Sequence, residues 1–429
     1  MDKNVSSSTR VFFGLSSFQI LAMFRRGLFY SYLSIYLRYF LGMSVTETTL
    51  FATIPMVLNV SFQTLVWGVL SDKYQLRRTF VILGEILAGI GTIIVFFTHR
   101  IVDQLNLAGW IIIIGLSIVE IFWSMSNNGW SALISDLIPY EERSAIQGRL
   151  SSMGGLGRII GVWIGGLLYD GLHLQYEGWG FYEGSLFFVA ASVMFLSTIP
   201  MVFVPEGGVH RESENELEQQ SYIGDVTTPS TQIFIIFLVA ITFINFGRNS
   251  IATILPQYLF IPSPGFGVSS ELLSYILNTQ SLAIILLGLI VGRMGHKLGN
   301  GNTILLGALM SIISLVLFAI STDLIFIFIA SFLRGSAQVI VMASAYAFAS
   351  GLITPKERAK LFGLFNASFF LSWGLAGTII AGPITDYLLI SGVTEVLAYR
   401  TAFLTATFVT FIGAFLLIFL LIWIRPKST

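Results

Sequence analysis

Long apolar runs separated by short polar segments recur along the whole chain. A helix needs about 20 apolar residues to cross the roughly 30 Å hydrocarbon layer of a bilayer. Runs of that length predict twelve spans, over residues 11–40, 48–70, 79–98, 109–134, 149–170, 181–204, 231–260, 271–293, 303–321, 325–350, 361–388 and 400–424. Because backbone polar groups must be satisfied within the membrane, we expect an all-α membrane protein of twelve transmembrane helices.

A single long polar segment divides these spans into two groups of six. It lies between the sixth and seventh spans and carries four glutamates, Glu212, Glu214, Glu216 and Glu218. Its composition is typical of a flexible linker, with a surface helix as the alternative. We therefore expect a six-helix bundle over 1–205, a cytoplasmic linker over 206–231 and a second bundle over 232–429.

Composition narrows the class of protein further. The chain is 55% hydrophobic and 11% charged, which is outside the soluble globular range. Its zero net charge gives no indication of nucleic-acid binding, and the absence of cysteine excludes disulfides and thiolate metal sites. All four histidines fall in expected loops, so we expect no enzyme, no cofactor and no metal site. A receptor is disfavoured because it would be expected to append a sizeable soluble domain.

The two groups of spans repeat each other. Residues 137–148 match residues 352–363 at a constant offset of 215, with Leu, Ile, Glu, Arg and Gly in register. The first and seventh spans match at an offset of 222, pairing Arg26, Tyr36 and Leu37 with Arg248, Tyr258 and Leu259. Duplication of a six-span unit is typical of a transporter built from two rocking halves, with coincidence among apolar segments as the alternative.

A charged turn between the second and third spans, from Gly68 to Arg78, has Asp72 four residues after the glycine and basic residues on either side of Gln75. A weaker copy occupies residues 292–299. Together with the duplicated layout, these turns resemble the major facilitator superfamily over nearly the whole chain. The resemblance implies the major facilitator fold, with two pseudo-symmetric six-helix bundles, and secondary transport by alternating access. It also implies gating roles for loop residues Asp72, Arg77, Arg78, Glu142, Arg143, Glu357 and Arg358.

Lysines and arginines outside the spans gather on the side that holds both termini and the linker. The opposite side has Arg38, Arg100 and Arg400. Because positive residues are retained on the cytoplasmic side, we expect a multi-pass protein of the cell membrane with both termini cytoplasmic. We expect it to act as a monomer within the lipid bilayer.

Seven ionisable residues lie inside the expected spans: Arg25, Arg26, Glu85, Glu120, Arg158, Arg248 and Arg334. Each costs at least about 2.5 kcal/mol at the bilayer centre, so each is expected to face a wet cavity or a partner. On the fourth span, polar residues at helical spacing form one stripe of Ser117, Glu120, Ser124, Asn127 and Ser131. We interpret this stripe as a pore-lining face and Glu120 as the candidate proton-coupling residue.

The excess of arginine predicts an anionic substrate. Arg26 and Arg248 occupy matching positions of the two repeats, and a guanidinium grips carboxylate or phosphate in bidentate fashion. Arg25 points about 100° away from Arg26 around the helix, so the repeat match favours Arg26. The expected substrate-binding residues are Arg26, Tyr30, Asn127, Arg158, Arg248, Arg334 and Gln338. Structural bracing is the alternative for Arg158. A structural ion pair is the alternative for Arg334, within the core, and for Glu85, near the cytoplasmic gate.

We therefore expect a secondary transporter of a small organic anion, such as a carboxylate, sugar acid or phosphate ester, working as a proton symporter. The arginines of the first and seventh spans with Glu120 resemble the organic-anion branches of the superfamily. A proton-driven drug or metabolite exporter is the alternative. Residues 157–166 partly resemble the glycine-rich motif of the drug/proton antiporters, although Val162 stands where that motif has proline.

Overall fold

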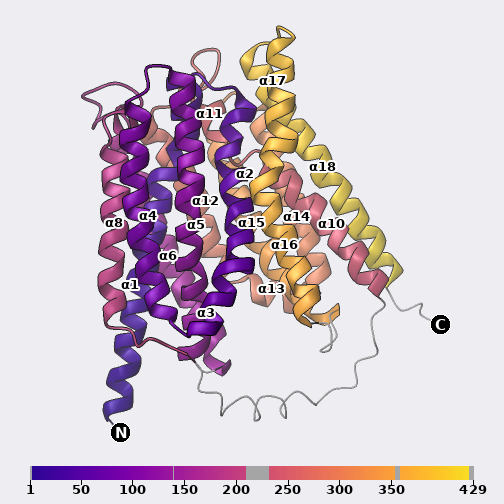
Figure 1. Cartoon of the computed structure of the whole chain (residues 1–429). Helices are drawn as coiled ribbons and strands as arrows, with labels where there is room; N and C mark the ends of the chain where they lie inside the picture. The colour runs from indigo at the N-terminus through magenta and orange to yellow at the C-terminus, as the bar shows by residue number, and fades with distance from the viewer. Residues whose placement is uncertain (1, 139, 209–230, 353–357, 425–429) are drawn as a thin grey trace, which may run out of the picture. The chain divides into compact units, whose positions relative to one another are not determined.

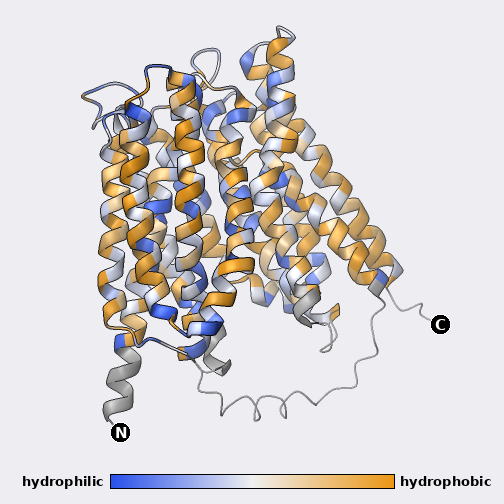
Figure 2. Ribbon diagram, viewed as in Figure 1, coloured by the Kyte–Doolittle hydropathy of each residue, from blue (hydrophilic) through white to orange (hydrophobic). Residues whose placement is uncertain are grey.

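The computed structural model describes residues 2–138, 140–208, 231–352 and 358–424, and the regular structure within those ranges is helical. Eleven of the described helical stretches are long and apolar enough to cross a membrane, and α1 (Asp2–Ile35) is a further long helix. Figures 1 and 2 show these helices and the apolar residues that predominate along them. The architecture is the all-α membrane fold that the apolar runs predict.

The helices follow one another with short connections. In the first part of the chain these are α1, α2 (Val45–Phe62), α3 (Gly68–Tyr74), α4 (Arg77–Arg100), α5 (Leu105–Leu137), α6 (Tyr140–Tyr169), α7 (Trp179–Tyr182) and α8 (Ser185–Val202). The second part contains α10 (Thr231–Ser250), α11 (Leu255–Phe260), α12 (Ser270–Gly288), α13 (Val291–Leu298), α14 (Asn300–Ile320), α15 (Leu324–Leu352), α16 (Arg358–Ala376), α17 (Gly382–Ile390) and α18 (Glu395–Trp423). Short π-helical segments occupy Tyr36–Phe40, Gln63–Trp67 and Gly377–Ala381.

The chain forms two compact units. Unit 1 comprises Met1–Ser44, Leu50–Ser213 and Ser269–Tyr275, and unit 2 comprises Val45–Thr49, Glu214–Val268 and Ile276–Thr429. Of the expected linker, residues 209–230 lie outside the described residues. The division into bundles at 205 and 232 therefore stays a prediction.

Unit 1 is held together by pairs of helices in close contact. Helix α1 packs against α6 and α8, and α4 packs against α5 and α8. The α1–α6 contact is made through glycines of α6, because a Cβ added at Gly157 would lie 2.2 Å from the Ile20 carbonyl oxygen, and one at Gly161 would lie 2.0 Å from that of Phe24. The two backbones therefore touch, and this seam fixes the position of α1.

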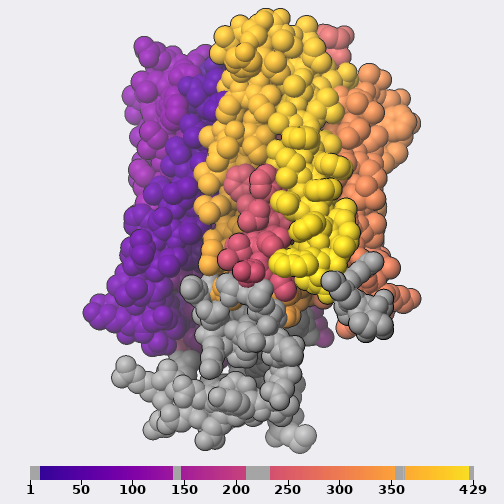
Figure 3. All heavy atoms as spheres, turned by 90° about the vertical axis from the view of Figure 1, so that its right-hand side faces the viewer, coloured from indigo at the N-terminus to yellow at the C-terminus, as the bar shows by residue number. Residues whose placement is uncertain are grey.

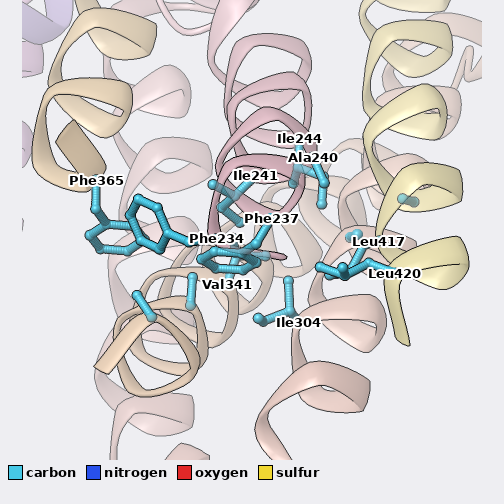
Figure 4. Packing of buried hydrophobic residues seen from close by; sticks show 14 of the residues in the cluster. Phe234, Phe237, Ala240, Ile241, Ile244, Ile304, Val341, Phe365, Leu417 and Leu420 are labelled. Carbon is cyan, nitrogen blue, oxygen red and sulfur yellow. The ribbon is translucent and has the colours of Figure 1, made fainter. Parts of the chain in front are cut away.

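Unit 2 has a core of buried side chains from five helices. Phe234, Phe237 and Ile241 of α10 face residues of α14, α15, α16 and α18, as Figure 4 shows. Phe237 stacks on Phe365 of α16, with ring centroids 6.3 Å apart and the planes 12° from parallel. These contacts join α10 to its neighbours through apolar packing.

The outer surface of α18 is a stripe of large exposed apolar side chains. Phe408, Phe411, Phe415 and Phe419 are each more than half exposed, at 63%, 56%, 61% and 59%. Figure 3 shows α18 in yellow from one side of the molecule. An apolar face of this extent is typical of contact with lipid rather than water.

The expected seventh span is not one continuous helix. Helix α10 ends at Ser250, four turn residues follow, and α11 begins at Leu255 with Pro256 in its first turn. Proline has no N–H with which to continue the preceding helical hydrogen bonds, but it fits the first turn of a new helix. The break therefore comes just before a proline that fits the first turn of the new helix.

Candidate functional site

The membrane-embedded charges of unit 1 gather around one indole ring. The guanidinium of Arg26 on α1 lies over the ring of Trp123 on α5, 4.0 Å from its centroid. Among the charged groups acting on Arg26, Glu120 is the strongest, followed by Arg25. A guanidinium stacked on an aromatic face keeps its planar fork of N–H donors free for a ligand.

Arg25 approaches the same ring from a more buried position. Its guanidinium lies 4.9 Å from the Trp123 centroid, its side chain is 3% exposed, and its Nε has no hydrogen-bond partner among the described residues. We expected Arg25 and Arg26 to diverge, since they leave the helix about 100° apart. Their long side chains nevertheless converge on Trp123, so both arginines belong to one cluster.

Glu120 is held by a neighbouring helix rather than by an arginine. Asn59 of α2 donates a hydrogen bond from Nδ2 to Glu120 Oε1 at 2.7 Å, and Asn59 is buried. Among the described residues no ion pair joins Glu120 to Arg26, although the two charges interact. Glu120 lies three residues before Trp123 on α5, which places both on the same face of that helix. The carboxylate is thus positioned beside the arginines without occupying their hydrogen-bond donors.

Glu85 of α4 belongs to the same cluster. It is 1% exposed, and Ser126 of α5 donates a hydrogen bond to its Oε1 at 2.9 Å. Its strongest charged neighbour is Arg25, and Arg26 acts on it more weakly. If Glu85 has the structural role that we gave as the alternative, its partner is Arg25 of α1.

The other expected substrate-binding residues of unit 1 surround this cluster. Tyr30 and Arg158 are half-buried and interact electrostatically with Arg26. Arg158 has no carboxylate partner among the described residues. Asn127 is also half-buried, one turn beyond Trp123 on α5. Arg158 therefore adds positive charge to the cluster.

The polar stripe expected along the fourth span is only partly available to a ligand. The hydroxyls of Ser117, Ser124 and Ser131 donate to carbonyl oxygens three or four residues earlier on α5. Serine in a helix commonly bonds back in this way. These three hydroxyls therefore keep only their acceptor sites for a ligand, and the pore-lining role of the stripe stays a prediction.

Unit 2 carries its expected residues on α10 and α15. Arg248 is 8% exposed, and its Nε donates to Asn245 Oδ1 at 2.8 Å, one turn earlier on α10. Gln338 accepts a hydrogen bond from Gln280 at 3.0 Å. Arg334 is half-buried and already engaged by a neighbouring group. Arg248 is thus oriented by an amide, and no carboxylate among the described residues neutralises it.

The charged turn between α3 and α4 is organised around Arg77. Its Nε lies 3.2 Å from Asp136 Oδ2 and its Nη1 lies 3.1 Å from Asp72 Oδ1, and it also donates to Ser71 Oγ. The side chain of Asp136, in the last turn of α5, is 9% exposed, whereas the Asp72 side chain is 77% exposed. Gln75, between these charged residues, has a left-handed φ of 56°. The buried partner of Arg77 is therefore Asp136.

Arg78 contacts the segment that follows α8. Its Nε lies 3.2 Å from Glu206 Oε2 but is not aligned for a hydrogen bond, and its Nη1 donates to the Val204 carbonyl at 3.0 Å. Glu206 also accepts hydrogen bonds from the backbone N–H and the hydroxyl of Thr79, both at 2.9 Å. Residue Glu206, which we assigned to the linker, is thus part of unit 1.

The second charged turn has no comparable network among the described residues. Arg293 and Lys297 are exposed on α13, and the turn contains no carboxylate. The gating residues expected in the two Glu-Arg segments, Glu142, Arg143, Glu357 and Arg358, lie outside the described side chains.

The chain matches the family model described as Major Facilitator Superfamily over residues 15–262 and 237–429. The chain belongs to the Major Facilitator Superfamily. It is a multi-pass membrane transporter, not an enzyme. Solved structures have the same fold. A mutant form of the nucleoside transporter NupG has a TM-score of 0.74 at 15% identity, covering 96% of this chain and 99% of NupG.

Other members of the superfamily are similar in sequence or fold. The multi-drug resistance efflux pump PmrA of Streptococcus pneumoniae is 24% identical over 325 residues, covering 74% of this chain and 75% of PmrA. The multidrug resistance protein MdtG of Rahnella sp. is 22% identical over 321 residues, covering 70% and 73%. A bacterial homolog of the human lysosomal transporter Spinster has a TM-score of 0.71 at 14% identity, covering 96% and 97%.

Sequence reasoning missed four residues of these networks: Trp123, Asn59, Asp136 and Glu206. Trp123 is one of several aromatic residues on an apolar helix, so nothing in its spacing distinguished it. Asn59 is a buried amide in an expected span, and that burial of a polar group was the signal available. Asp136 and Glu206 sit at the ends of spans, where charged residues are common.

Proposed function

We propose that this transporter carries a small organic anion together with a proton by alternating access. Arg26 would bind the carboxylate or phosphate group of the substrate, and Glu120 would bind the proton. Arg248 of unit 2 would act as a second anion ligand, and the Arg77 network would bias the conformational equilibrium. We also propose the cell membrane as its location, with both termini in the cytoplasm.

The observation that carries this proposal is the arrangement of Arg26, Trp123 and Glu120. Trp123 supports the Arg26 guanidinium from its face, and Asn59 holds Glu120 beside it. The cluster therefore presents a desolvated cation whose neighbouring carboxylate is bonded elsewhere. A half-buried guanidinium inside the membrane that no carboxylate contacts directly is costly, and an anionic ligand would remove that cost when bound.

The same arrangement sets the sign of coupling between substrate and proton. An ionised Glu120 partly neutralises Arg26 and repels an anion, whereas a protonated Glu120 does neither. Protonation therefore raises the affinity for the anion, and by thermodynamic reciprocity the anion raises the affinity for the proton. Two ligands that promote each other's binding cross the membrane in the same direction, which is symport.

A drug or metabolite exporter is the second candidate, because the relatives PmrA and MdtG are named as multidrug proteins. In that case the substrate would be a lipophilic cation that binds near the ionised Glu120. A proton would then compete with the substrate, and the coupling would be antiport. The two candidates therefore differ in the sign of one measurable quantity, the change of substrate affinity with pH.

The test is binding of labelled glucuronate, glycerol phosphate and tetraphenylphosphonium to purified protein in acidic and alkaline buffer. We expect the anions to bind more tightly in acid, by about 5- to 150-fold for a coupling of about 1–3 kcal/mol. Tetraphenylphosphonium binding that weakens in acid, with no anion binding, would instead support the exporter. Uptake into proteoliposomes under a pH gradient provides the direction of transport.

Glu120→Gln should retain anion binding and weaken its dependence on pH. The matched control is Glu177→Gln, an exposed glutamate in the loop before α7. That control removes a titrating glutamate outside the cluster. It should leave the pH dependence of anion binding as it is in the wild type.

A further inference from the structure

Glu85 is a buried acid that the proposed mechanism leaves without a role. It sits where α4 and α5 touch, because a Cβ added to the adjacent Gly84 would lie 2.7 Å from both the Phe122 carbonyl oxygen and the Ser126 nitrogen. Helix α4 therefore has no room for water on that side. The carboxyl group is 1% exposed and accepts a hydrogen bond from Ser126, and Trp123 also acts on it as a hydrogen-bond donor.

Arg25 is the positively charged group that acts most strongly on Glu85. Among the described residues the two do not form an ion pair. Arg25 is equally buried, and its Nε is without a hydrogen-bond partner there. Two permanent buried charges of opposite sign gain most by closing into direct contact, since each is strongly destabilised alone. Ser126 and Trp123, rather than Arg25, act on the carboxyl group as hydrogen-bond donors, so no contact ion pair among the described residues holds it ionised.

We propose that Glu85 is a second proton-binding group of the transport cycle and acts on Arg26 through Arg25 and Trp123. A proton from the aqueous phase would add to the Glu85 carboxylate, on which the Ser126 hydroxyl and the Trp123 indole act as hydrogen-bond donors. The neutral acid no longer attracts Arg25. Arg25 and Arg26 face the same Trp123 ring, so a change in the field on one guanidinium acts directly on the other.

The charges of the cluster give the expected sign. Three arginines, Arg25, Arg26 and Arg158, face two glutamates, so the cluster carries one net positive charge when both acids are ionised. Each added proton makes it more positive by one and favours an anion. Helix α8, which also packs on α4, carries no titratable side chain in Ser185–Val202. The groups that face Glu85 are therefore those of α1 and α5.

The first experiment needs no substrate, because its probe is the proton. Infrared difference spectra of purified protein between alkaline and acidic buffer report the C=O stretch of each carboxyl group that becomes protonated. We expect Glu85→Gln and Glu120→Gln each to remove a different buried-carboxyl band, and Glu177→Gln to remove neither. A Glu85→Gln spectrum identical to that of the wild type would overturn the proposal.

A pair of serine variants tests the assignment without changing the acid. Ser126→Ala removes the donor to the ionised carboxylate, so the Glu85 band should appear at a more alkaline pH. Ser124→Ala removes a buried hydroxyl on the same helix that bonds the Ile121 carbonyl instead, and should leave the band in place. Equal titration in both variants would contradict a functional Glu85, even if Glu85→Gln failed to fold.

The transport measurement rests on the proposed function, while the spectra do not. In proteoliposomes the reversal potential of labelled glucuronate flux reports the number of protons carried per anion. Glu85→Gln should lower that number by about one relative to the wild type, as should Glu120→Gln, because each acid binds a proton linked to the anion. An unchanged ratio in Glu85→Gln overturns the proposal. Absence of glucuronate transport in the wild type counts against the proposed function, and the infrared result then decides on Glu85 alone.

Discussion

Replacing Asp136 should destabilise the transporter far more than replacing Asp72, although both contact Arg77. Asp136→Asn keeps the shape of the side chain and removes its charge. Arg77 and Asp136 have side chains that are 8% and 9% exposed, so their ion pair is buried. Asp72 is 77% exposed, so its contact with Arg77 is screened by water. The two substitutions therefore compare a buried and an exposed partner of one guanidinium.

The magnitudes follow from burial. Breaking a buried pair by removing one charge costs about 3–5 kcal/mol, and the remaining Asp72 contact reduces this to roughly 2–4 kcal/mol here. Losing an exposed pair costs about 0–1 kcal/mol. Because about 1.4 kcal/mol is a factor of ten, Asp136→Asn should lower the folding equilibrium constant by at least about 25-fold. Asp72→Asn should lower it by about fivefold at most.

The assay is unfolding of the purified variants in mixed micelles over a series of denaturant concentrations, together with transport into proteoliposomes. Asp72→Asn is expected to fold almost as well as the wild type but to transport more slowly, since it changes a conformational bias rather than the core. Equal unfolding free energies for the two variants, or a larger loss in Asp72→Asn, would refute the reasoning. Wild-type turnover in Asp72→Asn would separately remove Asp72 from the gate.

Three further substitutions test individual features. Arg26→Lys keeps the charge but loses the planar fork, so glucuronate binding measured by titration should weaken by about 1.5–3 kcal/mol with the melting temperature unchanged. A lower melting temperature with intact affinity would instead make Arg26 a brace. Gln75→Gly relieves a left-handed backbone and should raise unfolding free energy by about 0.5–1 kcal/mol, and a loss would argue against strain there. Gly161→Ala should cost at least about 1–3 kcal/mol by overpacking against α1, whereas Gly148→Ala, with open space around it, should not lower the melting temperature.

The sequence predicted the number and approximate position of the long helices because the thickness of a bilayer sets their length. It also indicated Arg26 and Glu120, because a charge inside a membrane needs a physical reason. It did not indicate that α10 would end at Ser250, because a proline beyond an apolar run is compatible with either a kink or a new helix.

The rest of the site depends on contacts that no spacing encodes. Trp123 brings Arg25 and Arg26 together, and this depends on how α1 and α5 pack. Asp136 joins Arg77 across 59 positions of the chain, the length of two helices and the turn between them. The serine hydroxyls of α5 had the periodicity of a polar lining, yet they bond their own helix, because periodicity shows which side a residue is on and not what its hydroxyl binds.

The glycine seam between α1 and α6 has an evolutionary consequence. The two helices meet backbone to backbone at Gly157 and Gly161, so the frame that carries the arginines does not depend on the identity of the side chains around it. Substitutions of those side chains can therefore change the substrate while the packing of α1 against α6 is retained. The fold shared with NupG at 15% identity fits such a history. Gly157 and Gly161 should then be among the positions that tolerate substitution least.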